Sequence, residues 1–223
     1  GARFEQPLSD VLPSVTVITK EEMQKSQGRT VFDVLQGLPG LEIGMNGGMG
    51  ATSSFFMRGE NSNSIAIYVD GIQVRPDGYG SMSNNTSFPP LQSIERIEVL
   101  RGNAGALYGE NAIGGVINIY TTAGSNQPPK AFASVTYGSY NTIDSTAGIS
   151  GRLGDTKFNL SANDTSSTGF ATMNSAHPPA WDYATSAKTG AYAGHGVNLG
   201  VSEIINSSIE VGIKERYQSN TFT

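Results

Sequence analysis

The segment Ile94-Glu-Arg-Ile-Glu-Val-Leu-Arg-Gly102 stands just before Ala106-Leu-Tyr-Gly-Glu-Asn-Ala-Ile-Gly-Gly-Val-Ile-Asn-Ile-Tyr-Thr121. Each contains a short run rich in apolar and β-branched side chains, at residues 96–100 and 116–120, with glycine close by. Runs of this composition next to glycine predict β-strands joined by tight turns.

Two helices and several further strands are predicted on the N-terminal side of these segments. Thr19 is a candidate N-cap, Glu22 completes a capping box with it, and Gly28 ends the helix. Thr30 caps a second helix, because apolar residues recur at helical spacing over residues 31–38 before Pro39-Gly40 stops it. The first half is therefore a mixed α/β domain, with additional strands predicted at residues 15–18, 41–45, 54–57 and 65–69.

The composition changes near residue 123. Residues 123–129 contain Gly, Asn and two prolines and indicate a linker. Beyond it the chain is rich in Ser, Thr, Asn and Gly, and apolar side chains alternate with polar ones. Such alternation fits a membrane β-barrel and an ordinary β-sandwich equally well. The alternating segments are residues 131–137, 156–162, 197–201 and 209–217.

The lengths of the connections favour the membrane barrel. Residues 151–155 predict a tight turn, whereas residues 166–186 form a long loop that carries Phe170, Trp181 and Tyr183. Outer-membrane barrels have short turns on one side of the membrane and long loops on the other. Strands of this size would place the tight turn and the long loop on opposite sides.

Charge and composition exclude several function classes. The chain of 223 residues has a net charge of −5 and only 15% charged residues, which argues against binding nucleic acid. It has no cysteine, so thiolate metal sites and disulfides are excluded. The only two histidines, His177 and His195, lie in the second half and support no catalytic triad. The glycines at 47–50 lack the Gly-Lys-Ser/Thr ending of a phosphate-binding loop.

Neither a spanning helix nor a signal peptide is predicted. No stretch reaches the roughly 20 apolar residues that a membrane-spanning helix needs. Residues 1–7 lack the basic start and apolar run of a signal peptide.

Three segments together resemble the plug domain of TonB-dependent outer-membrane receptors. They are Phe55-Phe-Met-Arg-Gly59 with Ile67-Tyr-Val-Asp-Gly71, then residues 94–102, then residues 106–121. The resemblance is dense over residues 3–122 and looser beyond. Asn103 departs from the family, which usually has proline at this position, and alters only a turn.

The resemblance implies an α+β plug domain with a small mixed β-sheet and short helices. Antiparallel transmembrane β-strands of an incomplete β-barrel would follow, in a family whose barrels have about 22 strands. The expected organisation is a plug at residues 1–122, a linker at 123–130 and the first barrel strands at 131–223. The chain is therefore expected to be a fragment, with the TonB box just upstream of residue 3.

The resemblance also implies a location and partners. The protein is expected in the bacterial outer membrane, with the base of the plug facing the periplasm. Its partners would be TonB, a bulky nutrient ligand and outer-membrane lipid, with no nucleic acid. The plug performs no bond chemistry in this family, so neither an enzymatic activity nor a cofactor is expected.

Within the family, the plug is most similar to that of the cobalamin-transporting members. Residues 3–7 and 46–50 carry this likeness, which favours a corrinoid over an iron-siderophore or haem. Those members order their outer loops with calcium bound to several aspartates. Residues 167–182 contain one candidate ligand, Asp182, and calcium needs six or more oxygens, so no metal site is predicted.

The two glycine-rich loops are expected to be plug apices that contact the ligand, because small residues let the backbone approach a bulky ligand closely. The aromatic contact would come from Tyr79. The predicted ligand-binding residues are Asn46, Gly47, Gly48, Met49, Gly50, Ala51, Thr52, Asp77, Gly78, Tyr79, Gly80 and Ser81.

Charged plug residues are expected to face the barrel wall. By resemblance, arginines of this type pair with wall carboxylates, since charges that lose water must be paired. The predicted plug–barrel contacts are Arg58, Asp70, Arg96, Glu98 and Arg101. A second hypothesis is a non-transporting surface protein rich in β-structure that uses the same plug fold.

Overall fold

The computed structural model describes residues 15–26, 28, 30–45, 52–74, 82–83, 88–109, 111–122, 124–170, 190–206 and 209–222. They form two compact units. The first comprises residues 1–46 and 52–121, and the second comprises residues 47–51 and 122–223. Each unit has its own sheets and is described separately.

Both predicted helices are confirmed, and each is shorter than expected. Helix α1 (Lys20–Lys25) begins at a capping box in which the Thr19 N–H donates to Glu22 Oε2 at 2.8 Å. It ends at Ser26 because the Ser26 hydroxyl donates to the Met23 carbonyl. Helix α2 (Val31–Gln36) has its own capping box, from Thr30 to Asp33. No helix among the described residues is long and apolar enough to cross a membrane.

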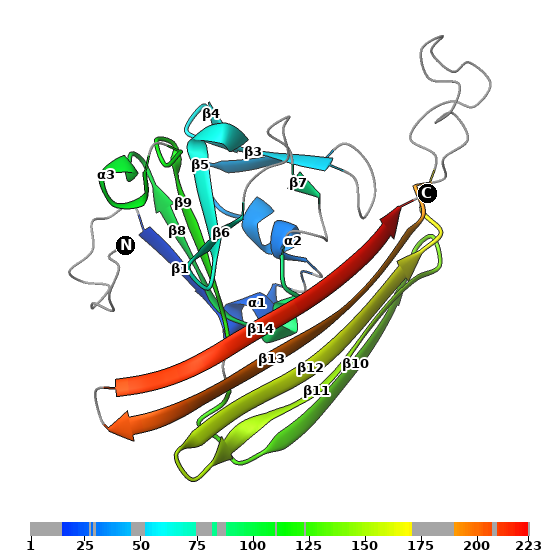
Figure 1. The fold of residues 1–223 in the computed structure, drawn as a ribbon. Coiled ribbons are helices and arrows are strands. Elements are labelled where there is room, and N and C mark those ends of the chain that lie inside the picture. Colours follow the sequence, from blue (N-terminus) through cyan, green and yellow to red (C-terminus); the bar gives the residue numbers. More distant parts are fainter. Residues whose placement is uncertain are drawn as a thin grey trace. The chain divides into compact units, whose positions relative to one another are not determined.

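The main sheet of the first unit is mixed, as expected. Its order is β1–β8–β9–β5–β6, and only β5 and β9 run parallel (Figure 1). The segments at residues 94–102 and 106–121 contain β8 and β9, which pair antiparallel at the centre of this sheet. The strands are β1 (Val15–Thr19), β5 (Ile65–Val69), β6 (Ile72–Val74), β8 (Ile94–Arg101) and β9 (Gly115–Thr121).

A smaller antiparallel sheet completes the first unit. In it β3 pairs with β2, with β4 and, at its first two residues, with β7. The strands at residues 41–45 and 52–57 were predicted, whereas the other elements outside the main sheet are short and were not. The elements are β2 (Leu41–Met45), β3 (Thr52–Met57), β4 (Glu60–Asn61), β7 (Met82–Ser83), the 3-10 turns η2 (Ser62–Ser64) and η3 (Leu91–Ser93), and helix α3 (Gly105–Tyr108).

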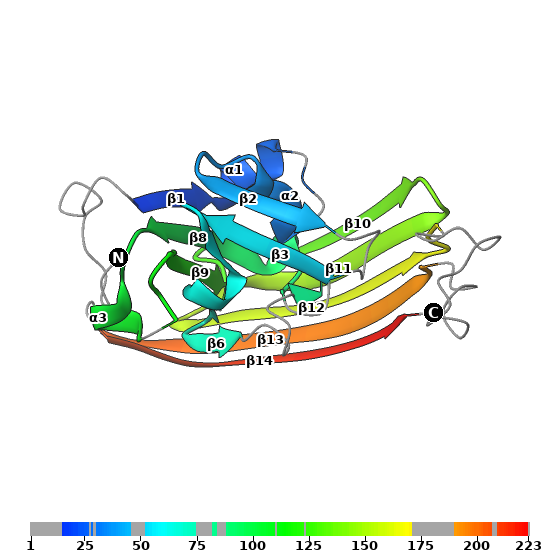
Figure 2. The ribbon, with the colours of Figure 1, turned by 90° about the horizontal axis from the view of Figure 1, so that it is seen from above.

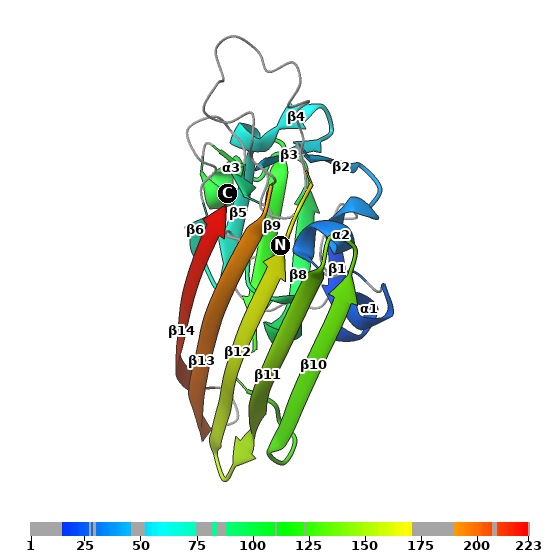
Figure 3. The same ribbon diagram turned by 90° about the vertical axis from the view of Figure 1, so that its right-hand side faces the viewer.

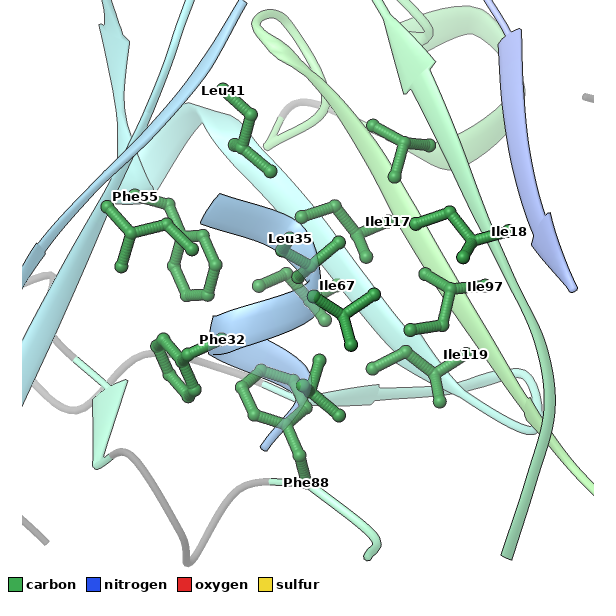
Figure 4. Packing of buried hydrophobic residues seen from close by; sticks show 14 of the residues in the cluster. Ile18, Phe32, Leu35, Leu41, Phe55, Ile67, Phe88, Ile97, Ile117 and Ile119 are labelled. Carbon is green, nitrogen blue, oxygen red and sulfur yellow. The ribbon is translucent and has the colours of Figure 1, made fainter. Parts of the chain in front are cut away.

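The hydrophobic core lies between the main sheet, α2 and the small sheet (Figure 4). The Phe32 ring lies 5.1 Å from that of Phe55 and 5.2 Å from that of Phe88. Leu35 of α2 and Ile117 of β9 are fully buried. Because α1 and α2 have six residues each, they are too short to be stable alone and depend on this packing.

The second unit is one sheet of five sequential antiparallel strands, seen side by side in Figure 3 and along their bend in Figure 2. The turn expected at residues 151–155 is tighter, since β11 continues to Leu153. Strands β11 to β14, of 12 to 15 residues, are also longer than the alternating segments of the sequence. The strands are β10 (Lys130–Gly138), β11 (Thr142–Leu153), β12 (Thr156–Ser167), β13 (Tyr192–Asn206) and β14 (Ile209–Phe222).

The predicted alternation is confirmed by the register. Leu160 pairs with Leu199, and Val201 pairs with Ile213, so apolar side chains gather on one face. Polar residues such as Asn159 and Asn198 occupy the other face, where they are buried. This is the arrangement of a sheet with one apolar and one polar side.

The start of β9 generates a test of the packing in the first unit. A Cβ at Gly115 would lie 2.3 Å from Met57 Sδ and 2.4 Å from the Leu100 carbonyl oxygen. Because the carbonyl belongs to the sheet and cannot move aside, Gly115→Ala should destabilise the first unit by about 1–3 kcal/mol. Urea unfolding of the unit measures the effect. Gly37→Ala is the control, because its added Cβ meets only the Val34 carbonyl, at 3.9 Å. If Gly37→Ala lowered the free energy of unfolding as much as Gly115→Ala, the collision at Gly115 would not be the cause.

Candidate ligand loops and charged sites of the first unit

The structure brings the flanks of the two predicted ligand loops together. Met45 precedes the first loop and pairs with Ser53, just after it. The residue after the second loop region, Met82, also pairs with Ser53, and Thr52 pairs with Ser83. The flanks of both loops therefore lie at the same end of the small sheet, on the two sides of β3. Nothing in the sequence predicted this, because β7 has only two residues.

Most of the predicted ligand residues lie outside the described residues. This holds for residues 46–51 and 77–81, and Thr52 is described only as the first backbone position of β3. The same applies to Trp181, Tyr183 and the candidate calcium ligand Asp182 in the long loop. The structure therefore describes only the strands that flank these loops.

The three motifs of the sequence meet at one place in the first unit. Arg58 follows β3 with a positive φ of 52°. A Cβ added at Gly102 would lie only 3.1 Å from Arg58 Nη1. The N–H of Gly102 in turn donates to the Gly114 carbonyl at 3.0 Å. A Cβ at Gly114 would lie 2.7 Å from Glu60 Cβ, so glycine at positions 102 and 114 permits the turn after β3 to pack on the end of β8 and the start of β9.

Arg101 is bound inside the first unit by one of its donors. Its Nη1 donates to Thr16 Oγ1 of β1 at 2.7 Å. Its Nε is buried and has no hydrogen-bond partner among the described residues. A buried guanidinium N–H without an acceptor costs free energy, so this atom destabilises the first unit unless it gains a partner.

Asp70 binds the end of β9. Its Oδ1 accepts from the Thr121 N–H at 3.0 Å, and its Oδ2 accepts from the Thr121 hydroxyl at 2.5 Å. The Asp70 N–H donates to the Ile119 carbonyl at 2.9 Å. Asp70 adopts a positive φ of 49°, a conformation that Asp tolerates better than most residues.

Arg96 and Glu98 form an ion pair on the face of the main sheet that carries Tyr120. Arg96 Nε lies 3.0 Å from Glu98 Oε1, and the guanidinium stacks over the Tyr120 ring with 4.0 Å to its centroid. Burial lowers the pKa of Arg96, but the hydrogen bond and charge of Glu98 outweigh it and the pKa is raised. Burial, followed by the charge of Glu98, raises the pKa of the Tyr120 phenol, while Arg96 opposes the shift.

Four of the five predicted contact residues thus have partners inside the first unit, and the fifth, Arg58, packs on Gly102. Their pairing with a barrel wall stays a prediction. Sequence reasoning missed the partners Thr16, Tyr120 and Thr121. No local signal reveals them, since Thr16 is 85 positions from Arg101 and Thr121 is 51 from Asp70.

Residues 7–116 match the family model of the TonB-dependent receptor plug domain. The chain belongs to the TonB-dependent receptors. The family confirms the predicted location, the bacterial outer membrane, and its members are receptors and transporters, not enzymes. The chain is 46% identical over 121 residues to the Vitamin B12 transporter BtuB of Vibrio vulnificus. The match covers 54% of this chain and 20% of that transporter.

Solved TonB-dependent receptors share the fold of both units. The pyoverdine receptor FpvA of Pseudomonas aeruginosa bound to pyoverdine matches with a TM-score of 0.71 and 21% identity, over 93% of this chain and 27% of that chain. The siderophore receptor PirA of Acinetobacter baumannii matches with a TM-score of 0.67 and 24% identity, over 93% and 32%. At these identities the likeness concerns the fold alone.

Titration of Tyr120 tests how Arg96 and Glu98 shift its pKa on their common face of the main sheet. Because Arg96 lowers the raised pKa of Tyr120, Arg96→Met should raise it further, whereas Glu98→Gln should lower it. Because the pKa of Tyr120 is raised in the folded protein, the contribution of its neutral phenol to stability is complete below the unfolded pKa of about 10. That contribution is lost as the pH rises through the folded pKa. Phenolate absorbance, with Tyr120→Phe identifying the signal, measures the shifts. Equal midpoints in the two variants would contradict the assignment.

Proposed function

We propose that this receptor takes up a bulky nutrient across the outer membrane by TonB-dependent active transport, with a corrinoid as the favoured ligand. The main support for this proposal is the 46% identity to a Vitamin B12 transporter over 121 residues. Those residues amount to 54% of the chain, and the plug match at residues 7–116 includes both predicted ligand loops. The proposal treats residues 1–122 as the plug, 123–130 as the linker and 131–223 as the first strands of a barrel of about 22 strands.

The convergence of the loop flanks supports a ligand site on the plug. Both loops end beside β3, so residues 46–52 and 77–81 would present their backbones to one ligand. A bulky ligand too large for porins needs several such contacts, because small polar patches contribute little binding energy each. The long loop after β12 would add further contacts in the complete receptor.

Energy for transport would come from TonB. In this proposal TonB binds upstream of residue 3 and pulls on the plug, which closes the barrel lumen and gives way locally because its stability is limited. Arg58 and Arg101 would hold the plug on wall carboxylates.

An iron-siderophore is the second candidate ligand. It is favoured by the structural likeness to receptors for pyoverdine and for ferric enterobactin. At the end of the second unit where the long loop begins, the rings of Tyr140 and Phe170 lie 5.0 Å apart and are partly exposed. Such rings stack on catecholates and on a corrin alike, so they do not choose between the two ligands.

Ligand titration decides between these candidates. The complete receptor should bind cyanocobalamin at micromolar or lower concentration in an equilibrium binding assay, because its plug loops match those of a corrinoid transporter. Calcium should change the affinity little, since residues 167–182 offer a single carboxylate. Absence of cyanocobalamin binding, together with saturable binding of a ferric siderophore, would transfer the assignment to iron uptake.

The anchoring role of Arg101 has a matched control. Thr16→Val removes only the internal hydrogen bond from Arg101, whereas Arg101→Ala also removes the Nε donor. If Nε binds a wall carboxylate, Arg101→Ala should lower the free energy of plug unfolding by about 1–3 kcal/mol more than Thr16→Val. Urea unfolding of the complete receptor measures both. If the two variants lowered the free energy of plug unfolding equally, the proposed contact between Arg101 Nε and a wall carboxylate would be wrong.

A further inference from the structure

The turn that joins β10 to β11 holds a tyrosine in a backbone conformation that suits tyrosine poorly. Tyr140 and Asn141 have positive φ angles of 58° and 50°. The Thr142 N–H closes the turn by donating to the Ser139 carbonyl at 3.2 Å. Two central residues with positive φ are the pattern of a type I′ hairpin turn, in which asparagine followed by glycine is the favoured pair. Asparagine tolerates a positive φ, whereas a bulky side chain such as tyrosine is an outlier there and costs free energy.

Hydrogen bonds from the end of β12 hold this strained backbone in place. The Tyr140 carbonyl accepts from the Thr168 N–H at 2.9 Å and from the Thr168 hydroxyl at 2.6 Å. Within the turn, the Thr142 hydroxyl donates to the Ser139 carbonyl at 2.6 Å. An unfavourable backbone conformation that its surroundings enforce is most often found where a protein contacts a ligand. The position of Tyr140 is therefore a candidate for a contact site.

The turn presents the Tyr140 ring to solvent beside a second aromatic ring. The Tyr140 side chain is 54% exposed, and its ring lies 5.0 Å from that of Phe170, which is 39% exposed. Phe170 is positioned by the start of the long connection after β12. A Cβ at Gly169 would collide with the Gly190 carbonyl, so these two backbones are in direct contact. We call the rings of Tyr140 and Phe170 the aromatic platform.

The charges around the aromatic platform are acidic. The described residues at this end of the second unit are 136–146, 162–170, 190–197 and 217–222, and they include neither lysine nor arginine. They do include Asp144, Asp164 and a single histidine, His195. An anionic ligand would meet two carboxylates here and no lysine or arginine among these residues, whereas an uncharged ligand would meet no repulsion. The surroundings of the platform thus favour an uncharged ligand.

We propose that the aromatic platform contacts the nutrient directly and stacks on a flat, uncharged face of it, such as a conjugated macrocycle. This inference rests on the proposed function, because it takes the end where the long connection begins as the outer side of a barrel. Aromatic rings offer a large contact area without a charge. A ring that the backbone holds in place before the ligand arrives also loses little conformational freedom on binding. The rings alone accept a catecholate equally well, and the acidic surroundings select the uncharged ligand.

Substitution of Tyr140 in the complete receptor tests the contact. Tyr140→Asn removes the ring and introduces a residue that tolerates the φ of 58°. The affinity for cyanocobalamin, measured by equilibrium titration, should fall about three- to tenfold, the factor that corresponds to one aromatic stack. Tyr140→Phe keeps the ring and should bind like the wild type. Unchanged affinity in Tyr140→Asn overturns the proposal.

A purely structural role for the Tyr140 ring predicts a different result. If the ring only packed on Phe170, Tyr140→Asn would lower the midpoint of thermal unfolding and leave the affinity unchanged. In the proposed arrangement the relieved backbone strain offsets the lost ring contact, so the midpoint should stay within about 2 °C of the wild type.

Tyr137→Thr is the matched control in the same hairpin. Tyr137 is also an exposed tyrosine, but it pairs with Ile143 on the apolar face of the sheet. Its substitution should leave the affinity for cyanocobalamin unchanged. If Tyr137→Thr weakened binding as much as Tyr140→Asn, the loss would belong to the hairpin in general and the platform would be wrong.

A second ligand tests the charge argument and separates this proposal from the proposed function. The wild-type receptor should bind cyanocobalamin, which is uncharged overall, more tightly than ferric enterobactin, an anionic chelate. If it binds cyanocobalamin and Tyr140→Asn binds it equally well, the platform alone fails. If it binds only the ferric chelate, the corrinoid and the uncharged ligand class are both wrong, and the Tyr140 variants are compared with that chelate. Equal binding of the chelate by Tyr140→Asn and the wild type would then overturn the contact as well.

Discussion

The close approach of β9 to its neighbours is the constraint on which the first unit depends. At Gly115 the strand begins directly against Met57 of β3 and the Leu100 carbonyl of β8, with no space for a side chain. This contact joins the small sheet to the main sheet. It also sets the depth at which the following residues, Ile117 and Ile119, enter the core beside α2. The three motifs that carry the family resemblance meet here because each supplies one side of this joint.

The charged residues of the motifs contribute to the fold as well as to any contact with a wall. Asp70 binds Thr121, Arg96 lies between Glu98 and Tyr120, and Arg101 binds Thr16. A half-buried charge is costly until it has a partner, and a partner within the same domain is available before the plug meets a barrel. Arg101 is the exception in part, because its Nε still lacks an acceptor among the described residues.

The second unit depends on a different constraint, the strict alternation of its strands. Apolar pairs such as Leu160 and Leu199 face one side, while the ion pair of Lys157 and Glu210, at 2.8 Å, lies among polar residues on the other. Glu215 breaks the pattern, because its register opposite Leu199 places a carboxylate on the apolar face. We have no physical account of this residue. Elsewhere the alternation suits a sheet with lipid on one side and a polar lumen on the other.

Sequence alone determined the elements whose signals are local. The capping residues Thr19 and Thr30 and the apolar runs of β8 and β9 predicted their helices and strands, because caps and short periodic runs act over a few neighbours. The family and the location followed from the motifs. Three kinds of feature were decided only by the tertiary structure: the pairing beside β3 of the strands that flank the two predicted ligand loops, the partners of Asp70 and Arg101, and the docking of residues 124–129. Each of these depends on backbone segments far apart in the chain that approach within hydrogen-bonding distance, and no local pattern of side chains records such an approach.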